Sequence, residues 1–310
     1  MKVSICCLTH NHEKYIKDCL GGFLMQKTNF DFEILIHDDA STDRTQEIIK
    51  EYEEKHPSLI KPIYQVENQF SKGIKPTWTF NYPRAQGEFI ALCEGDDYWT
   101  DPLKLQKQVD FLEGNEGYVL STHDSQIIFD DIQRYETQFR FNLSTFELND
   151  IIGSHPFATA SMLFRNILIH DDYFFLRNSK SFSSDKLLIG LLLSKGKGSF
   201  FKESMCVYRR NPGGLSTKKK WSEATQSSID AVTELQNYLK KGKSPTITHR
   251  LMLLYGKLYV FKRNEKDYKG AFKALYKSIV RIRKWDDVKL IIHDFIFYGK
   301  KTQLYKVINN

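Results

Sequence analysis

The residues best suited to chemistry form one acidic cluster, Glu94-Gly95-Asp96-Asp97. Three carboxylates within four residues repel one another unless a cation or solvent neutralises them. A hard divalent ion bound through oxygen atoms does this, and the same ion can bridge to phosphate oxygens. The alternative is an acidic surface turn, because Asp is a common turn former. The position of the cluster directly after an apolar run favours a metal site.

A second acidic pair, Asp38-Asp39, follows another apolar run, residues 32–37. A carboxylate at such a place can accept hydrogen bonds from a nucleobase or a ribose. Turn and helix-cap chemistry explains the same pair equally well, and the residues alone leave both interpretations open.

The elements expected before residue 115 would bring these groups together. The patterns predict strands at 2–9, 32–37, 61–66 and 88–93, alternating with helices at 15–25, 45–55 and 103–112. Such alternation is typical of an α/β fold with an open, mostly parallel sheet flanked by helices. Ligands bind beyond the carboxyl ends of such strands, which is where His10, Asp38-Asp39 and the acidic cluster stand.

The rest of the chain divides near residue 220. Residues 116–220 are less periodic, with strands expected at 118–122, 125–129, 160–164 and 204–208 and a helix at 185–193. After Trp221 the pattern is helical, with one apolar stripe through Ile229, Val232, Leu235 and Leu239 and another through Tyr268, Ala271, Leu275 and Ile279. The prediction is a domain over 1–220, made of halves 1–115 and 116–220, followed by a helical extension over 221–310.

Three ordered motifs carry a family resemblance. They are Val3-Ser4-Ile5-Cys6-Cys7-Leu8-Thr9-His10-Asn11, then Glu33-Ile34-Leu35-Ile36-His37-Asp38-Asp39-Ala40-Ser41-Thr42-Asp43, then Gly87-Glu88-Phe89-Ile90-Ala91-Leu92-Cys93-Glu94-Gly95-Asp96-Asp97-Tyr98-Trp99. In type and spacing they resemble glycosyltransferase family two, whose members have the GT-A fold. The resemblance implies a Rossmann-like nucleotide-sugar-binding half, an acceptor half reaching about residue 217, and inverting sugar transfer.

The resemblance also implies roles for residues at the strand ends. Asp39 resembles the carboxylate that reads the nucleobase. Thr9, His10 and Asn11 lie in the turn that cradles base and ribose, with His10 where the family often has Tyr. Asp96 resembles the residue near the ribose and the metal.

Asp97 resembles the metal ligand, and the implied ion is Mn²⁺ or Mg²⁺. Glu94 occupies the first acidic place of the family's Asp-x-Asp pattern and is one methylene longer, so direct ligation by Glu94 stays open. Asn211 stands where the closing segment of the family usually has His, which leaves its place in the metal site open as well.

Asp185, in Ser183-Ser184-Asp185-Lys186, resembles the catalytic base of the family. In a single displacement the acceptor hydroxyl must lose its proton as it attacks the anomeric carbon. The alternative is that Asp185 caps the helix that follows. Arg209 and Arg210 can neutralise diphosphate charge, and Gly213-Gly214 with residues 217–220 resembles a mobile basic lid.

Composition narrows the class of protein. The chain has 310 residues, 41% hydrophobic and 27% charged, as is ordinary for a soluble globular protein. Its five cysteines show neither metal-ligand spacing nor a disulfide framework, so a reducing, cytoplasmic compartment is expected. The first apolar run is too short for a signal peptide, and no stretch approaches the ~20 apolar residues of a membrane span.

Charge is uneven along the chain. Residues 240–310 hold 18 Lys and Arg against 5 Asp and Glu, a net charge of +13, whereas the preceding residues carry −6. Basic helices bearing Trp285, Phe295, Phe297 and Tyr298 are suited to the surface of an anionic membrane, which would place the protein on the inner membrane face. Homo-oligomer formation through the same helices is the rival use. A solvated helical surface without any partner explains the basic charge equally well.

The sequence therefore predicts a metal-dependent glycosyltransferase that moves sugar from a nucleotide-diphosphate sugar, UDP-sugar favoured, to a glycan or lipid-linked acceptor. The alternative is a non-catalytic protein of the same fold that binds nucleotide-sugar or organises an assembly, which Asn211 favours. A dinucleotide-dependent oxidoreductase is a poor third hypothesis, because no Gly-x-Gly-x-x-Gly follows the first strand. No nucleic-acid-binding motif is present, so no nucleic-acid partner is expected.

Overall fold

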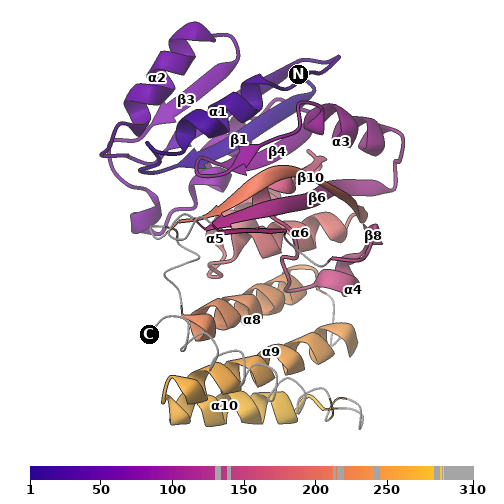
Figure 1. Ribbon diagram of the computed structural model, residues 1–310. Helices are drawn as coiled ribbons and strands as arrows, with labels where there is room; N and C mark the ends of the chain where they lie inside the picture. Colours follow the sequence, from indigo (N-terminus) through magenta and orange to yellow (C-terminus); the bar gives the residue numbers. More distant parts are fainter. Residues whose placement is uncertain are drawn as a thin grey trace. The chain divides into compact units, whose positions relative to one another are not determined.

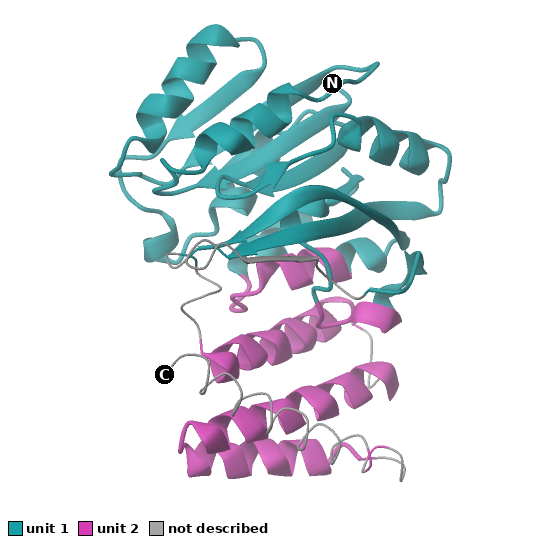
Figure 2. Cartoon of the chain, viewed as in Figure 1, with its two compact units in different colours: residues 1–148, 155–178, 191–217 teal, residues 149–154, 179–190, 218–310 magenta. Residues whose placement is uncertain are grey.

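The computed structural model describes residues 1–129, 134–137, 141–211, 214, 220–240, 245–282, 287 and 289, with the backbone alone for 134–137. The chain forms two compact units (Figure 2). Unit 1 comprises residues 1–148, 155–178 and 191–217. Unit 2 comprises residues 149–154, 179–190 and 218–310.

The first half of unit 1 is a parallel sheet in the order β3-β2-β1-β4 (Figure 1). Its elements are β1 (Val3–Thr9), α1 (Ile16–Leu24), β2 (Phe32–Asp38), α2 (Thr45–Lys55), β3 (Ile60–Tyr64) and β4 (Phe89–Glu94). Each lies within two residues of its predicted bounds. Between β3 and β4 run three short helices, η1 (Phe70–Lys72), η2 (Thr77–Asn81) and η3 (Tyr82–Arg84).

The main core lies between this sheet and three helices. Alternate residues of β1, β2 and β4 pack against apolar residues of α1, α2 and α3 (Lys104–Glu113). Strands buried on both faces read as continuous apolar runs, which is why the sequence pattern located them. The register sets Leu8 beside Glu94 and Thr9 beside Asp38, so the three strand ends meet at one edge.

The second half of unit 1 makes the sheet mixed. The order continues β4-β9-β6-β10-β5, where β9 runs antiparallel to both β4 and β6, and β6 is parallel to β10. The remaining elements of unit 1 are β5 (Tyr98–Trp99), β6 (Tyr118–Phe129), β7 (Arg134–Thr137), β8 (Thr145–Phe146), η4 (Thr159–Ser161), β9 (Leu163–Arg165), α5 (His170–Asn178) and β10 (Lys197–Arg210), while α4 (Leu148–Ile151) falls almost wholly in unit 2. The two strands expected between 118 and 129 are one, and the strand expected at 160–164 begins as a helical turn.

β10 is the element that completes the site. It is longer than the strand predicted at 204–208, and it pairs antiparallel with β5, setting Cys206 beside Trp99 and Val207 beside Tyr98. This pairing brings the end of β10 to the acidic turn.

The C-terminal helices belong to unit 2. Helix α9 (Pro245–Asn264) packs against both α8 (Trp221–Tyr238) and α10 (Tyr268–Ile279) (Figure 1). The stripe predicted on α8 is confirmed at Ile229, Val232 and Leu235, which are buried. None of the helices in the described part of the chain has the length and hydropathy to span a membrane.

The stripe predicted on α10 is wrong at both ends. Tyr268 and Ile279 are 68% and 51% exposed, whereas the buried side chains are the small ones, Ala271, Ala274 and Ser278. Small residues let α9 and α10 approach closely, and the rings of Tyr268 and Tyr276 lie on an exposed, outward face of α10. Phe272, at 73% exposed, belongs to the same outward face.

Candidate active site

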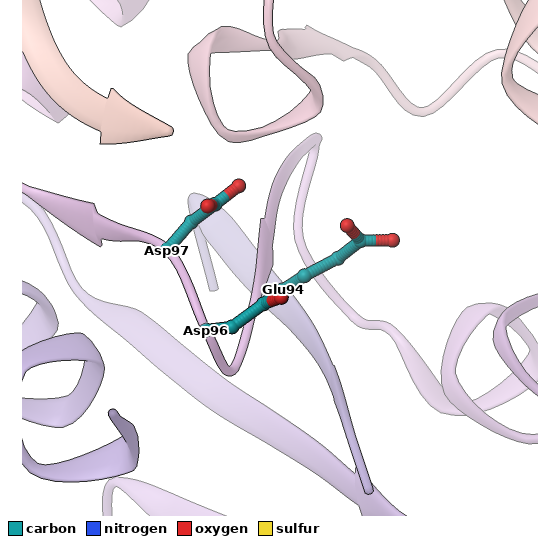
Figure 3. Close-up of side chains that lie close together, drawn as sticks. All are labelled: Glu94, Asp96 and Asp97. Carbon is teal, nitrogen blue, oxygen red and sulfur yellow. The ribbon is translucent and has the colours of Figure 1, made fainter. Parts of the chain in front are cut away.

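The acidic cluster is the turn between β4 and β5, and its three side chains leave that one turn (Figure 3). One oxygen from each of Glu94, Asp96 and Asp97 can be chosen so that all three lie within 4.8 Å of one another. The turn is fixed because the Gly95 amide donates to the Leu8 carbonyl over 2.9 Å and the Asp97 amide donates to the Glu94 carbonyl over 3.0 Å. The geometry suits a hard cation bound through oxygen atoms.

At Gly95 the turn packs closely against the end of β1. A Cβ atom at position 95 would lie 2.6 Å from Thr9 Oγ1 and 3.0 Å from His12 Nδ1. Any larger residue would push the turn off the strand, so the site depends on the close approach that glycine permits. Thr9 Oγ1 and His12 Nδ1 are buried and have no hydrogen-bond partner among the described residues.

Asp97 is the buried member of the cluster, at 1% exposed. Its Oδ1 accepts a 2.8 Å hydrogen bond from the Arg209 amide, and its buried Oδ2 has no partner in the described part of the chain. Burial, followed by the charges of Asp96 and Glu94, raises the pKa of Asp97 well above its usual value. An unpaired buried carboxylate oxygen beside two further carboxylates fits a divalent cation, which would offset both effects.

Asp96 receives two side chains from distant parts of the sequence. Its Oδ2 accepts a 2.8 Å hydrogen bond from Asn211 Nδ2, and His12 Nε2 lies 3.9 Å from the same oxygen. Asn211 is buried at the end of β10. Burial lowers the pKa of His12, which keeps its ring neutral near pH 7. The structure therefore places Asn211 at the acidic turn, as its sequence position predicts, without assigning it to a metal.

Arg209 fastens β10 to the acidic turn and to α1. Its Nη1 donates to the Asp96 carbonyl over 3.1 Å, and its guanidinium forms an ion pair with Asp18. The guanidinium also lies over the rings of Tyr98 and Tyr15, at 4.5 and 5.2 Å from their centres. These contacts engage the side chain within the protein, so a diphosphate contact by Arg209 stays a prediction.

The other basic groups expected here are only partly described. Arg210 lies over Phe129 at 5.6 Å, and its Nε is buried and unpaired among the described residues. Of the predicted lid, Gly213 and residues 217–219 lie outside the described residues, whereas Gly214 and Lys220 are described.

The predicted nucleotide pocket lies at the ends of β1 and β2. Asp39 is buried, and its two carboxylate oxygens accept the amides of Gln69 and Phe70 over 2.7 and 3.0 Å. His10 Nδ1 donates to the Asp39 carbonyl over 2.9 Å, because a carbonyl only accepts. Asn11 Nδ2 lies 3.3 Å from the other ring nitrogen, so it is the donor of that pair.

Both ring nitrogens of His10 are thus engaged, and the residue is exposed. What remains for a ligand is the ring face, which suits stacking on a nucleobase. Asn11 has a left-handed backbone, φ 56°, and its side-chain oxygen accepts the Thr42 amide over 2.7 Å. Asn11 therefore shapes the turn that presents His10.

Asp185 lies in unit 2, in the first turn of α6 (Ser184–Leu193). Because α6 begins at Ser184, Asp185 is inside the helix and not at the capping position before it. The neighbouring Lys186 donates to Ser228 Oγ over 2.6 Å. The role of Asp185 as a base stays a prediction.

Four contributors to this region escaped sequence reasoning. His12 and Asp18 follow β1 as ordinary polar residues of a turn and a helix, and Gln69 and Phe70 act through backbone amides, which carry no side-chain signal. Of these four, His12 alone offered a signal in the sequence, because histidine can bind metals and carry protons.

Comparisons with known proteins identify relatives. The family model described as Glycosyl transferase family 2 matches residues 4–177. An uncharacterized protein of Mycobacterium tuberculosis is 34% identical over 218 residues, which are 69% of this chain and 60% of that protein. A poly(ribitol-phosphate) beta-N-acetylglucosaminyltransferase of Staphylococcus aureus, TarS, is 34% identical over 99 residues, 32% of this chain and 17% of TarS.

Solved structures match over most of the chain. TarS 1–349 in complex with UDP-GlcNAc has a TM-score of 0.61 at 18% identity, covering 89% of this chain and 91% of that one. The mannosyltransferase PcManGT of Pyrobaculum calidifontis, in complex with GDP-Man and Mn²⁺, has a TM-score of 0.56 at 14% identity, covering 97% and 83%. The predicted fold class, an α/β GT-A type sheet followed by C-terminal helices, is confirmed. The chain spans about 60% of the length of its mycobacterial relative.

Proposed function

Because the chain belongs to glycosyl transferase family 2, we propose that it transfers a sugar from a nucleotide-diphosphate sugar to an acceptor hydroxyl. The observation that carries this proposal is the buried Asp97 carboxylate, whose Oδ2 is unpaired among the described residues, in an acidic turn at the edge where β1, β2 and β4 end. That edge is where open α/β sheets bind nucleotides.

The donor we favour is a UDP-sugar. TarS, which shares the fold, was solved with UDP-GlcNAc. In this chain the exposed face of His10 would stack on the base, and Thr9 and Asn11 would line the ribose. Asp39 would act on the base through the Gln69–Phe70 turn, because both of its oxygens already hold that turn in place.

The divalent site would be formed by Asp97 and Asp96, with Glu94 and Asn211 at its margin. Mn²⁺ or Mg²⁺ bound there would neutralise the diphosphate as it leaves, so no protein acid is required on the leaving group. Asp97 and Asp96 would hold the ion and so fix the place of the diphosphate relative to the turn, while Arg210 would add positive charge at the same strand end.

The reaction we propose is an inverting single displacement. Asp185 would accept the proton of the acceptor hydroxyl as the oxygen bonds to the anomeric carbon and the bond to the nucleoside diphosphate breaks. One carboxylate is enough, because the leaving group departs unprotonated. Residues 1–115 would then serve the donor and 116–220 the acceptor, with 221–310 as an accessory region.

The acceptor class is a glycan or lipid-linked glycan of a surface polysaccharide. Support comes from the printed names of relatives, among them TarS and the putative teichuronic acid biosynthesis glycosyltransferase TuaG of Bacillus subtilis. The rival proposal is a protein that binds nucleotide-sugar without turnover, which the Asn211 substitution favours. If the protein binds the nucleotide-sugar but neither transfers nor hydrolyses its sugar, the non-catalytic proposal would be correct.

A panel of nucleotide-sugars tested by thermal shift with Mn²⁺ checks the donor. At a hundred times its Kd a ligand stabilises the native state by about 2.7 kcal/mol, and we expect UDP-sugars to raise the unfolding midpoint by roughly 5 °C. Uridine, which lacks the diphosphate, should cause little shift. A shift with GDP-sugars alone would overturn the UDP assignment, and no shift with any nucleotide-sugar would overturn the donor proposal.

We also propose that the C-terminal helices meet an anionic membrane surface, which would place the protein at the cytoplasmic face of the membrane. The residues first singled out for this, Trp285, Phe295, Phe297 and Tyr298, lie outside the described residues. The outward face of α10 offers support, because exposed aromatic residues and exposed lysines lie next to one another on it: Tyr268, Lys269, Phe272, Lys273 and Tyr276. Aromatic rings at the headgroup level beside basic side chains are typical of interfacial helices.

Co-sedimentation with vesicles tests the membrane proposal. Wild-type protein should bind phosphatidylglycerol vesicles and not phosphatidylcholine vesicles, with weaker binding at high salt. The double variant Phe272→Ser, Tyr276→Ser should lose most of this binding, whereas Phe174→Ser, which alters an exposed ring of α5, should not. Equal binding by all three proteins would defeat the proposal, and concentration-dependent self-association abolished by the double variant would favour the oligomer instead.

A further inference from the structure

Two side chains from opposite ends of unit 1 converge on one oxygen of the acidic turn. Asn211, which follows β10, donates from Nδ2 to Asp96 Oδ2 over 2.8 Å. His12 lies in the turn between β1 and α1, and its Nε2 is 3.9 Å from the same oxygen. Asn211 is one of the candidate ligands named from the sequence. His12 has no role in the site as derived so far.

The position of His12 is fixed by its backbone. Its amide donates to Thr45 Oγ1 over 2.8 Å, and its carbonyl accepts the amides of Tyr15 and Ile16 over 2.9 Å each, which starts α1. None of these bonds uses the imidazole. The ring packs edge to face with Tyr15, 6.2 Å between centres, and its side chain is 19% exposed.

The ring is therefore held at the acidic turn with its polar atoms uncommitted. Nδ1 is buried against Gly95 and has no partner among the described residues, and the contact of Nε2 with Asp96 is too long for a hydrogen bond. A neutral imidazole in this state loses hydrogen bonds on burial without replacing them. A ligand at the turn would give Nε2, the nitrogen nearer Asp96, a partner.

We propose that His12 supplies an imidazole nitrogen to the divalent cation of the acidic turn, through Nε2, alongside Asp96. The inference rests on the proposed function, since it concerns the same metal site. Two atoms each ~2.1 Å from one ion lie ~3.0 Å apart as neighbours and ~4.2 Å apart on opposite sides. The 3.9 Å between His12 Nε2 and Asp96 Oδ2 lies near the second of these separations, so a small shift of either side chain would let both atoms bind one ion.

The chemistry of the donor set has a consequence for ion choice. Carboxylate oxygens alone suit Mg²⁺ as well as Mn²⁺, whereas an imidazole nitrogen favours transition metals. The imidazole would come from His12 in the turn between β1 and α1. The residue that follows β10 is Asn211, whose amide bonds to Asp96 and supplies no imidazole. The site should therefore prefer Mn²⁺ over Mg²⁺ by means of His12.

Pulsed electron paramagnetic resonance of the full chain with Mn²⁺ and UDP tests the assignment. The wild-type complex should show the nitrogen coupling of a bound imidazole. His12→Asn should remove that signal and weaken Mn²⁺ binding, measured calorimetrically, by about tenfold or more, with a smaller loss for Mg²⁺. The control His170→Asn removes an exposed histidine of α5 and should change neither quantity.

A swap variant guards against a merely structural effect. If His12→Asn acts by disturbing the fold, adding Asn211→His should not repair it. If the site needs an imidazole at Asp96, the double variant His12→Asn, Asn211→His should regain nitrogen coupling and most of the Mn²⁺ affinity. A nitrogen signal that persists in His12→Asn, or Mn²⁺ bound by wild type without such a signal, would overturn the His12 assignment and leave the metal site standing. Absence of any Mn²⁺ binding in the presence of UDP would overturn the metal site of the proposed function as well.

Discussion

Asp97→Asn is expected to reduce turnover of the nucleotide-sugar by about a thousandfold, the size of effect that follows loss of one preorganised electrostatic group. Asp97 is the buried carboxylate of the acidic turn, and its unpaired Oδ2 is the most available anionic ligand there. The amide keeps the shape of the side chain and its Oδ1 can still accept the Arg209 amide. The loss would therefore report the missing charge. Release of nucleoside diphosphate with Mn²⁺ present is the measurement.

The same substitution should leave the protein without metal as stable as wild type, or more stable. Burial and the neighbouring carboxylates raise the folded-state pKa of Asp97. Between the ordinary pKa near ~4 and that raised value, the folded state binds more protons than the unfolded state. The free energy of unfolding therefore falls as pH rises through this window. Asparagine removes that pH dependence, and it also removes the stabilisation by Mn²⁺ and UDP.

Asp110→Asn is a matched control for Asp97→Asn, because it neutralises an exposed carboxylate on α3 that bonds only to Gln106 in the described structure. It should keep wild-type turnover and wild-type stabilisation by Mn²⁺. Turnover above one tenth of wild type in Asp97→Asn would contradict the assigned role. So would a marked loss of stability without metal, since this would make Asp97 a structural residue.

Asp185→Asn is expected to lower kcat by about 10²- to 10⁴-fold, the range for removal of a general base. The KM for donor and the affinity for Mn²⁺ with UDP should change little, because the proposed base meets the acceptor and not the donor. Water serves as the acceptor in donor hydrolysis, so the loss can be measured before the natural acceptor is identified. Initial rates over a range of donor concentrations separate kcat from KM.

The control for Asp185→Asn is Asp230→Asn, which removes a carboxylate of α8 bonded to Gln226 within unit 2. It should leave kcat unchanged. An Asp185→Asn variant with wild-type kcat would show that another group takes the proton. A rise in KM for donor at unchanged kcat would instead place Asp185 in substrate binding.

The half of the fold built on the β3-β2-β1-β4 sheet was predictable because its information is local. Each strand of the β3-β2-β1-β4 sheet is a short apolar run with polar residues at its end, and each intervening helix shows its own periodicity. The strand-end rule then placed Asp39 and the acidic cluster at one edge without knowledge of any contact.

What could not be predicted depends on pairing between distant segments. The bond from the Arg209 amide to Asp97 exists because β10 runs on to Arg210 and pairs with β5, more than a hundred residues earlier. Likewise, the hydrogen bond from the Gln69 amide to Asp39 depends on the path that the chain takes after β3. The engagement of Arg209 with Asp18 is of the same kind, which is why its side chain was assigned to diphosphate from charge alone.

The α10 stripe shows a different limit. Periodicity finds a helix and an apolar face, but it does not reveal which face a neighbour covers. Ala271, Ala274 and Ser278 are weakly apolar, yet they make the contact with α9 because close approach of two helices favours small side chains.

Calorimetric titration of UDP into wild type and Asp97→Asn, each with and without Mn²⁺, tests most directly whether the acidic turn holds a cation against the diphosphate. The predicted result is that Mn²⁺ tightens UDP binding to wild type at least about tenfold, a coupling of ~1.4 kcal/mol, and has no effect on binding to Asp97→Asn. Equal UDP affinity with and without Mn²⁺ in wild type, or an undiminished effect of Mn²⁺ in Asp97→Asn, would contradict it.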